Sequence, residues 1–202
     1  MTSRERTSRP LAVAITGGIG AGKSEALRAF ARHGAATISA DEIVHRLYED
    51  EEVQGQLLER WGDRVRGTDG IDRKRVGEIV FADRGELEWL ESILHPRVVA
   101  AQKAVRDGLA ALPEPPDVVV VEVPLLYETG GDARFDAVVV VTAPEEVRAA
   151  RTAVTGAADR ARRLIPDEEK VARADFAYVN DGSLDELDAF VSDVLARVTE
   201  QP

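Results

Sequence analysis

The chain has 202 residues, 44% of them hydrophobic, which is enough for one core or for a core with a smaller appended lobe. It contains no cysteine, so a disulfide framework, a thiolate nucleophile and a cysteine metal site are all excluded. The formal net charge of -11 argues against a protein that wraps nucleic acid or binds an anionic membrane, because either needs a broad cationic field.

The first third of the chain alternates short strands with helices. Residues 1–10 are polar and arginine-rich, with no apolar stretch of signal-peptide type after them, so we expect a disordered tail and a cytoplasmic protein. LAVAIT, residues 11–16, is typical of a buried strand, and a helix should begin within the GKSEALRAF that follows. AATIS, residues 35–39, predicts a second strand. Apolar residues then recur at helical spacing as far as Trp61, and Asp41 stands where a helix N-cap would.

The middle of the chain is predicted to be mainly helical. This character runs from Arg73 to about Leu112, and His95-Pro96 should interrupt it, because proline lacks the amide needed within a helix. We expect a helical lobe at about residues 62–112 that stands off the sheet. PEPP, residues 113–116, is the clearest helix breaker in the chain.

The last part returns to alternating strands and helices. Residues 118–123 and 136–142 are continuous valine-rich runs, as in strands covered on both faces, and both are far too short to span a bilayer. An arginine-rich helix should follow Pro144, and residues 176–179 form a last strand candidate before an amphipathic closing helix. These elements predict an α/β fold with a doubly wound, mostly parallel sheet, whose ligand-binding residues follow the carboxyl ends of the strands.

One segment has the pattern of a phosphate-binding loop. Residues Gly17 to Ser24, GGIGAGKS, match G-x-x-x-x-G-K-[ST] between a predicted strand and a predicted helix. The glycines let backbone amides turn toward a nucleotide's phosphates, and the helix N-terminus adds its positive end. Lys23 is expected to reach the β- and γ-phosphates, and the Ser24 hydroxyl to ligate Mg²⁺. The alternative is a glycine-rich turn that contains a lysine by chance, which the strand and helix on either side disfavour.

Three charged residues near predicted strand ends could take part in the chemistry. Asp41 could accept a proton from an attacking hydroxyl or help to hold the metal's water shell, or it could only cap a helix. Glu122 could reach Mg²⁺ through water, lie on the surface, or pair with an arginine. Arg151 could clamp a transferring phosphoryl group or lie on a solvated helix face. The reaction stays open at this point, since phosphate-loop proteins include kinases, switches, motors and transporters.

Five motifs follow one another in this sequence: AITGGIGAGKS, ISADEIVHRL, LESILHPRV, VEVPLLYE and ARADFAYVNDGS. In this combination and order they resemble the dephospho-CoA kinase family, over about residues 11–198. The resemblance implies a three-layer fold like that of P-loop nucleoside kinases, with a mostly parallel five-stranded sheet, in a single domain of residues 11–202. That domain would include the helical lobe at about 62–112, which binds the acceptor, and a short lid at about 148–166.

The resemblance also implies an activity. Members of this family transfer the γ-phosphoryl group of ATP to the ribose 3′-hydroxyl of dephospho-CoA, the last step of coenzyme A biosynthesis, so ATP and Mg²⁺ would be the cofactors. The expected partners are small molecules, ATP and dephospho-CoA, without nucleic acid or membrane. The protein is expected to be a monomer or a weak homo-oligomer.

Residues matched by the motifs take on the family's roles. Asp41 would take the proton of the 3′-hydroxyl, with Lys23 and Arg151 as the other catalytic residues, and Arg151 would begin the lid. The residues implied in ATP binding are Gly17, Gly18, Ile19, Gly20, Ala21, Gly22, Lys23, Ser24, Glu25, Asn180 and Gly182. Those implied in contact with dephospho-CoA are Asp41, His95, Pro96, Leu125 and Leu126, and Ser24 and Glu122 would hold the metal.

The predicted lid departs from the family pattern. Thr155 stands where family members usually carry a second arginine, Leu164 stands where a glutamine is usual, and the segment between is shorter than typical. Ser39 also replaces a common aspartate. Three arginines of the lid could replace the missing one: Arg160, Arg162 and Arg163. Two alternatives therefore stay open, a kinase for another small hydroxyl acceptor such as a nucleoside or nucleotide, and a nucleotide-binding relative with reduced or lost transfer.

Overall fold

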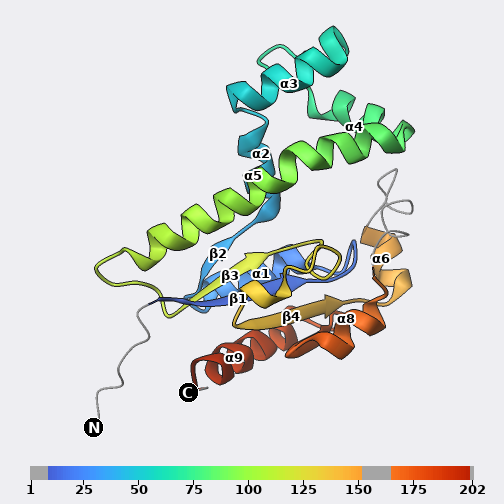
Figure 1. Ribbon diagram of the computed structural model, residues 1–202. Helices are drawn as coiled ribbons and strands as arrows, with labels where there is room; N and C mark the ends of the chain where they lie inside the picture. The colour runs from blue at the N-terminus through green and yellow to red at the C-terminus, as the bar shows by residue number, and fades with distance from the viewer. Residues whose placement is uncertain (1–8, 152–164, 201–202) are drawn as a thin grey trace. The chain divides into compact units, whose positions relative to one another are not determined.

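The computed structural model describes residues 9–151 and 165–200 (Figure 1). The described chain forms two compact units. The chain before Ala40 and after Ala104 forms the first unit, and Ala40–Ala104 forms the second. The first unit contains a five-stranded sheet in the order β2-β3-β1-β4-β5, with every pairing parallel. Its strands are β1 (Leu11–Thr16), β2 (Ala36–Ile38), β3 (Val118–Glu122), β4 (Ala137–Thr142) and β5 (Phe176–Val179). The predicted α/β fold and all five predicted strands are confirmed.

The sheet places the end of β1 at its centre. Val13 on β1 pairs with Val120 of β3 on one side and with Ala137 of β4 on the other. Strands covered on both faces favour unbroken β-branched residues, which explains the valine runs of β3 and β4. The chain leaves β1 for strands on one side of it and later returns for strands on the other. The carboxyl end of β1 is therefore the switch point at which such sheets bind ligands.

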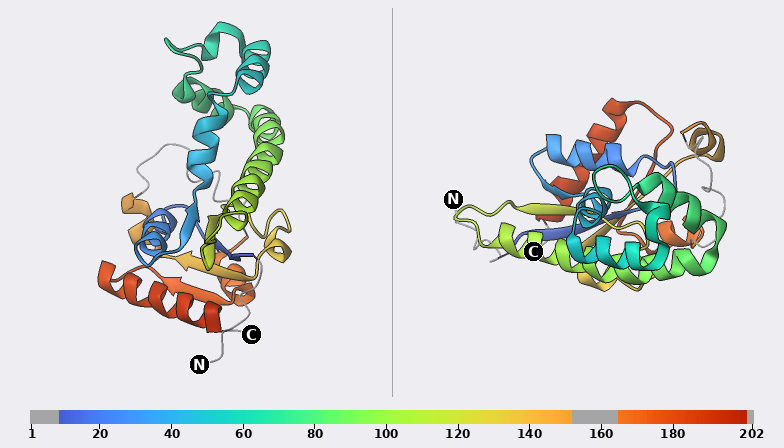
Figure 2. Two further views of the ribbon diagram at one scale, coloured as in Figure 1. Left: turned by 90° about the vertical axis from the view of Figure 1, so that its left-hand side faces the viewer. Right: turned by 90° about the horizontal axis from the view of Figure 1, so that it is seen from above.

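Among its described residues, this unit wholly contains four helices and one short 3-10 turn. They are α1 (Lys23–Arg32), η2 (Asp132–Arg134), α6 (Glu145–Arg151), α8 (Asp167–Arg173) and α9 (Leu184–Glu200). Helices α1 and α9 lie side by side (Figures 1 and 2) and pack over one face of the sheet. A capping box starts α9: Ser183 Oγ accepts from the Glu186 amide at 3.3 Å, and Glu186 Oε2 accepts from the Ser183 amide at 2.7 Å. The core under these helices includes Val13, Ile15, Phe30, Val139, Leu187, Val191 and Val194.

The second unit is helical. Its elements are α2 (Ala40–Leu47), α3 (Glu51–Trp61), η1 (Gly62–Val65), α4 (Arg73–Ala82) and the first part of α5 (Arg84–Ala110). Asp50 caps α3 by accepting from two amides at 3.0 Å each, and Asp72 caps α4 in the same way. The unit begins earlier than the lobe predicted at about 62–112, because α3 supplies part of its core. That core consists of Val53, Leu57, Trp61, Val65, Val76, Val80, Leu90 and Leu94.

The expectation that His95-Pro96 interrupts the helical region is wrong. Helix α5 continues through Pro96 for 27 residues in all. Proline removes the one hydrogen bond that its own amide would donate to Ser92. The helix is held on the preceding turns by Leu90 and Leu94, which are buried in the core of the unit. Packing of this apolar face outweighs the lost bond, as tertiary contacts usually outweigh local preference.

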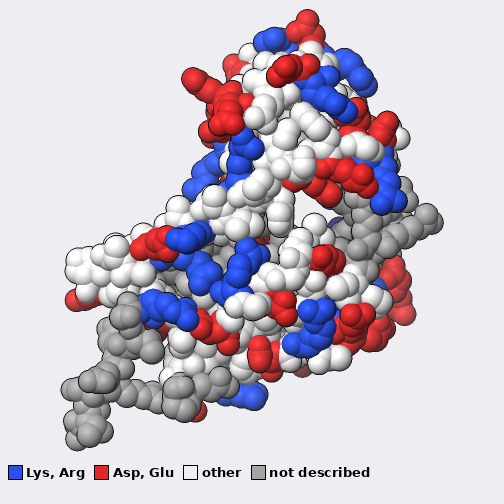
Figure 3. Space-filling view, in the orientation of Figure 1, with Lys and Arg blue, Asp and Glu red and all other residues white. Residues whose placement is uncertain are grey.

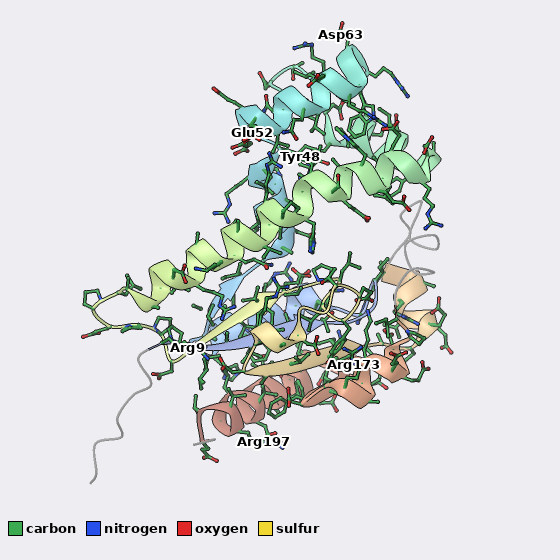
Figure 4. All side chains as sticks on the ribbon, in the orientation of Figure 1. Arg9, Tyr48, Glu52, Asp63, Arg173 and Arg197 are labelled. Atoms are coloured by element: carbon green, nitrogen blue, oxygen red, sulfur yellow. The ribbon has the colours of Figure 1, made fainter. Side chains whose placement is uncertain are left out.

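The chain is already tied to the sheet before β1. Residues 1–8 of the predicted tail lie outside the described residues. Arg9, labelled in Figure 4 near the start of β1, donates to both carboxylate oxygens of Asp136 at 2.7 and 2.8 Å. The same carboxylate accepts from the Ala12 amide at 2.7 Å. Asp136 thus fixes Arg9 and the start of β1 next to the start of β4. Arg9, which the predicted tail included, is therefore held against the sheet.

The surface carries both signs of charge. On the face drawn in Figure 3, acidic and basic side chains are interspersed over both units, with no broad cationic field on that face. Within the described residues, no helix combines the length and the apolar character needed to cross a membrane.

Candidate active site

The residues of the phosphate-binding pattern form a loop between β1 and α1. Close neighbours leave no room for a side chain at two of its glycines. Gly17 has φ 143° and Gly22 has φ 97°, a backbone region that favours glycine. A Cβ on Gly17 would lie 1.9 Å from the Val141 carbonyl oxygen. A Cβ on Gly22 would lie 2.0 Å from Nδ2 of Asn180. Glycine is therefore required at both positions by backbone conformation and by close neighbours.

Side chains from three parts of the chain hold the carbonyl groups of this loop. Lys23 Nζ donates to the carbonyls of Gly17 and Gly18 at 3.0 and 2.9 Å. Arg151 Nη1 donates to the carbonyls of Gly20 and Ala21 at 3.3 and 3.4 Å. Each bonded carbonyl fixes its peptide plane and with it the direction of the next amide. Oriented amides of this kind bind anions.

Asn180 is the most buried of these donors. Its Nδ2 donates to the Ala21 carbonyl at 2.9 Å, and the residue is 8% exposed. Its own amide donates to the Thr142 carbonyl at 2.7 Å, which anchors it to the end of β4. Asn180 thus connects the phosphate loop to the loop after β5. Gly182 lies two residues further on, where a Cβ would be 1.9 Å from the Glu186 carboxylate that completes the capping box.

The start of α1 faces the same loop. Gly22 is the N-cap of α1, and among the described residues no side chain caps it. Its first-turn amides therefore add the positive end of the helix to the loop. Ser24, in this first turn, is exposed, so its hydroxyl is open to a ligand. Glu25 turns to the helix surface instead, where it pairs with Arg28 at 2.6 Å and Arg32 at 3.1 Å. Hydrogen bonds from these two arginines hold the pKa of Glu25 below its ordinary value.

Glu122 ends β3 beside the loop-bearing strand. It pairs in register with Ile15 of β1 and is 4% exposed, which excludes the simple surface role. Ser39 Oγ lies 3.4 Å from Oε2 of Glu122, so the serine that replaces the family's common aspartate contacts this carboxylate. Among residues 9–151 and 165–200, no three or more His, Cys, Asp or Glu side chains gather as a metal site. A metal held here by Ser24 and Glu122 would take its other ligands from phosphate and water.

The loop after β3 contains an ion pair that the motif alone did not reveal. Glu128 Oε1 lies 2.8 Å from Nζ of Lys170 on α8 and accepts from the Ile165 amide at 3.0 Å. The Lys170 side chain is fully buried. Leu126 is also fully buried, which assigns its side chain to packing, whereas Leu125 is half-buried. In the sequence, only the motif VEVPLLYE and the family that it resembles pointed to this loop. The scarcity of lysine was the available signal for Lys170.

Comparison with known proteins decides the family. The sequence model described as dephospho-CoA kinase matches residues 11–186. The chain belongs to the dephospho-CoA kinase family. It is 38% identical over 194 residues to the dephospho-CoA kinase of Rhodopseudomonas palustris strain BisB18, covering 93% of this chain and 96% of the relative. It is 39% identical over 200 residues to that of Streptomyces avermitilis, covering 95% of each.

Solved structures agree with this assignment. TT1252 from Thermus thermophilus matches with a TM-score of 0.74 and 31% identity, over 94% of this chain and 98% of that one. The dephospho-CoA kinase from Campylobacter jejuni matches with a TM-score of 0.67 and 27% identity, over 94% and 97%. A shikimate kinase from Aquifex aeolicus, at 15% identity and a TM-score of 0.53 over 92% and 95%, shows the shared fold alone. The family and the kinase fold predicted from the ordered motifs are therefore confirmed, and with them the class of phosphotransferase.

Three of the five acceptor residues implied by the dephospho-CoA kinase family lie in the second unit, namely Asp41, His95 and Pro96. Asp41 is exposed and stands inside the first turn of α2, which begins at Ala40, so the N-cap alternative is wrong. An N-cap at Asp41 would make Glu42 the first helical residue, so the helix starts two residues earlier than the sequence pattern indicated. His95 and Pro96 are adjacent and exposed on α5. Exposure leaves all three residues accessible to a substrate, and their roles stay predictions.

The lid predicted for this member of the family falls mostly outside the described residues. Arg151 is the last residue of α6 and contacts the phosphate loop, as described above. The described chain resumes at Ile165, just before α8. The positions that differ from the family pattern, and their possible replacements, lie outside the described residues: Thr155, Leu164, Arg160, Arg162 and Arg163.

Proposed function

We propose that this chain transfers the γ-phosphoryl group of ATP to the ribose 3′-hydroxyl of dephospho-CoA, giving coenzyme A and ADP. The observation that carries the proposal is the phosphate loop, whose peptide planes are held by Lys23, Arg151 and Asn180 in a chain that matches the dephospho-CoA kinase family. Phosphoryl transfer depends mainly on positioning and on neutralisation of charge. A loop that is already ordered supplies the positioning.

The residues of the first unit fit a nucleotide with its magnesium ion. Gly17 and Gly22 leave the loop open to phosphate oxygens, and the Lys23 ammonium lies at the same loop. Ser24 offers an exposed hydroxyl, and Glu122 offers a buried carboxylate at the neighbouring strand end. Mg²⁺ held by Ser24, and through water by Glu122, would neutralise charge on the phosphates. Arg151 and Lys23 would provide the protein's own cations for the transferring group.

The residues of the second unit would serve the acceptor. Asp41 would accept the proton that the 3′-hydroxyl loses as it attacks. His95 and Pro96, on the exposed side of α5, would contact or shape the acceptor site. From the first unit, Leu125 is the accessible member of the leucine pair after β3. A cytoplasmic location and a monomeric or weakly oligomeric state remain predictions of the sequence.

The decisive test is an assay of purified protein with ATP, MgCl₂ and dephospho-CoA, in which CoA and ADP are quantified together. We expect equal amounts of both products, and we expect no comparable ADP formation with nucleosides or nucleoside monophosphates as acceptors. If one of those acceptors reacts faster, that acceptor and not dephospho-CoA is the substrate. ATP binding without any acceptor-dependent ADP would instead favour a relative that has lost transfer, with the lid positions as the first suspects.

The variant Asp41→Asn tests the role of the acceptor residue. We expect it to keep ATP affinity and to lower kcat by about 10²-fold to 10⁴-fold, the usual contribution of a general base. Glu42→Gln, the neighbouring exposed carboxylate in the same turn of α2, is the matched control and should keep kcat. An Asp41→Asn enzyme with unchanged kcat would remove Asp41 from the mechanism.

A further inference from the structure

An ion pair lies directly against the phosphate loop and has no role in the proposed chemistry. Arg148 of α6 donates from Nη1 to Oδ2 of Asp167 on α8 at 3.0 Å. A Cβ built on Gly18 would lie 2.8 Å from that same Nη1 and 3.1 and 3.2 Å from the two carboxylate oxygens of Asp167. The pair therefore fills the space that a side chain at Gly18 would occupy. Gly18 does not have a positive φ, so a side chain there would meet this pair but no backbone strain.

Both members of the pair are anchored outside the loop. Their side chains are only 27% and 20% exposed, so this is not a loose surface contact. Asp167 begins α8, and α8 is held by the buried Lys170, whose ammonium pairs with Glu128. Arg148 lies one helical turn before Arg151, whose guanidinium bonds the carbonyls of Gly20 and Ala21. The pair thus ties α6 and α8 to each other next to Gly18 of the loop.

We infer that Arg148 and Asp167 act as a positioning pair that holds the phosphate loop and Arg151 in their nucleotide-binding arrangement. Lys23 bonds the Gly18 carbonyl, and the pair lies next to the Gly18 α-carbon. Both contacts restrict the loop at Gly18. A loop ordered in advance loses less conformational entropy when phosphates bind, which raises affinity. This inference deepens the proposed function and rests on it.

The charges in the cluster argue against direct phosphate binding by Arg148. Arg148 Nη2 also pairs with Glu145 at 2.7 Å, so one guanidinium faces two carboxylates and the three groups sum to a formal charge of -1. Such a cluster does not attract a polyanion. It fixes geometry, and the two roles predict opposite behaviour when Asp167 loses its charge.

The test measures binding of MgADP and of adenosine by calorimetry for Arg148→Ala and Asp167→Asn. We expect both variants to weaken MgADP binding by about tenfold to a hundredfold, because the loop would then have to be ordered on binding, and to leave adenosine affinity unchanged. Glu145→Gln is the matched control, because Glu145 is 81% exposed and removing its charge leaves the Arg148 contact with Asp167 in place. It should bind both ligands as the wild type does.

Two results would overturn the inference. If Asp167→Asn binds MgADP as tightly as the wild type, or more tightly, while Arg148→Ala binds it weakly, Arg148 contacts phosphate directly. If both variants lose affinity for MgADP and for adenosine by the same factor, with a matching fall in Tm, the pair only stabilises the fold.

A substitution at Gly18 provides an independent check. Gly18→Ala should weaken MgADP in the wild type, because its methyl group would displace the Arg148 guanidinium. In the Arg148→Ala background, Gly18→Ala should weaken MgADP binding by a further factor of less than about two, since non-additive effects mark residues in contact. Full additivity would contradict the inference. Because these readouts are binding constants, a wild-type protein that binds MgADP but makes no CoA would defeat the proposed reaction and leave this inference standing.

Discussion

Gly22→Ala tests the close contact between the phosphate loop and Asn180. The added methyl group would meet Nδ2 of Asn180 at 2.0 Å, at a backbone φ of 97°. The left-handed backbone costs about 1–2 kcal/mol for a residue with a Cβ. Displacing Asn180 breaks its buried bond to the Ala21 carbonyl, which costs about 1–3 kcal/mol more. We therefore expect the free energy of unfolding to fall by about 2–5 kcal/mol.

The chain offers a control that isolates the backbone part of this cost. Gly34 has φ 90°, and a Cβ there would meet nothing within 4 Å. Gly34→Ala should therefore lose only the backbone contribution of about 1–2 kcal/mol. Urea denaturation at pH 7 gives the free energy of unfolding for both variants and for the wild type. Equal losses for Gly22→Ala and Gly34→Ala would show that the contact with Asn180 has no energetic weight, and would refute the reasoning.

Three further predictions concern charged groups. Lys23→Ala should lower kcat/KM for ATP by at least about 10²-fold, the usual effect of removing one preorganised charge donor. Tm should stay within about 4 °C of the wild type, because the Gly17 and Gly18 carbonyls that Lys23 bonds are neutral acceptors, so no buried charge is left unpaired. Glu128→Gln should lower the free energy of unfolding by about 3–5 kcal/mol in urea denaturation, because it leaves the buried Lys170 ammonium without its counter-charge. Adding Lys170→Met to this variant should recover most of that loss. If nothing is recovered, packing rather than charge is responsible for the loss. The two arginines of α1 lower the pKa of Glu25, so its contribution to stability is complete above its unfolded-state pKa of about 4.3 and is lost as pH falls through the lower folded-state pKa. Glu25→Gln should accordingly be less stable than the wild type at pH 7, by up to about 1 kcal/mol, and the difference should close near pH 3; a difference that is independent of pH would exclude the ion pairs as its source.

Much of the fold could be predicted from the chain, because strands and helices follow local patterns. Unbroken valine runs indicated strands covered on both faces, and the glycine-rich stretch from Gly17 to Ser24 indicated a phosphate loop between a strand and a helix. Helix ends were less predictable. Asp50 and Asp72 cap α3 and α4, and neither cap was identified, since an aspartate in a polar stretch resembles any loop residue until the helix after it is known.

Local preference was misleading where packing decided the outcome. Pro96 indicated a break, yet α5 continues because its apolar face is buried on the turns before it. Asp41 looked like a cap, yet α2 begins one residue before it. At Pro96 the outcome is set by the burial of Leu90 and Leu94, which a rule about proline alone does not contain.

The amino-acid sequence by itself determined the family, the sheet and the loop that would hold phosphates, because each depends on residues close together in the chain or on ordered motifs. Tertiary structure decided how that loop is held. Asn180 reaches the Ala21 carbonyl across 159 residues, Lys170 meets Glu128, and Arg148 meets Asp167 against Gly18. No spacing rule predicts such contacts, since strand order rather than chain order brings these side chains to one edge of the sheet.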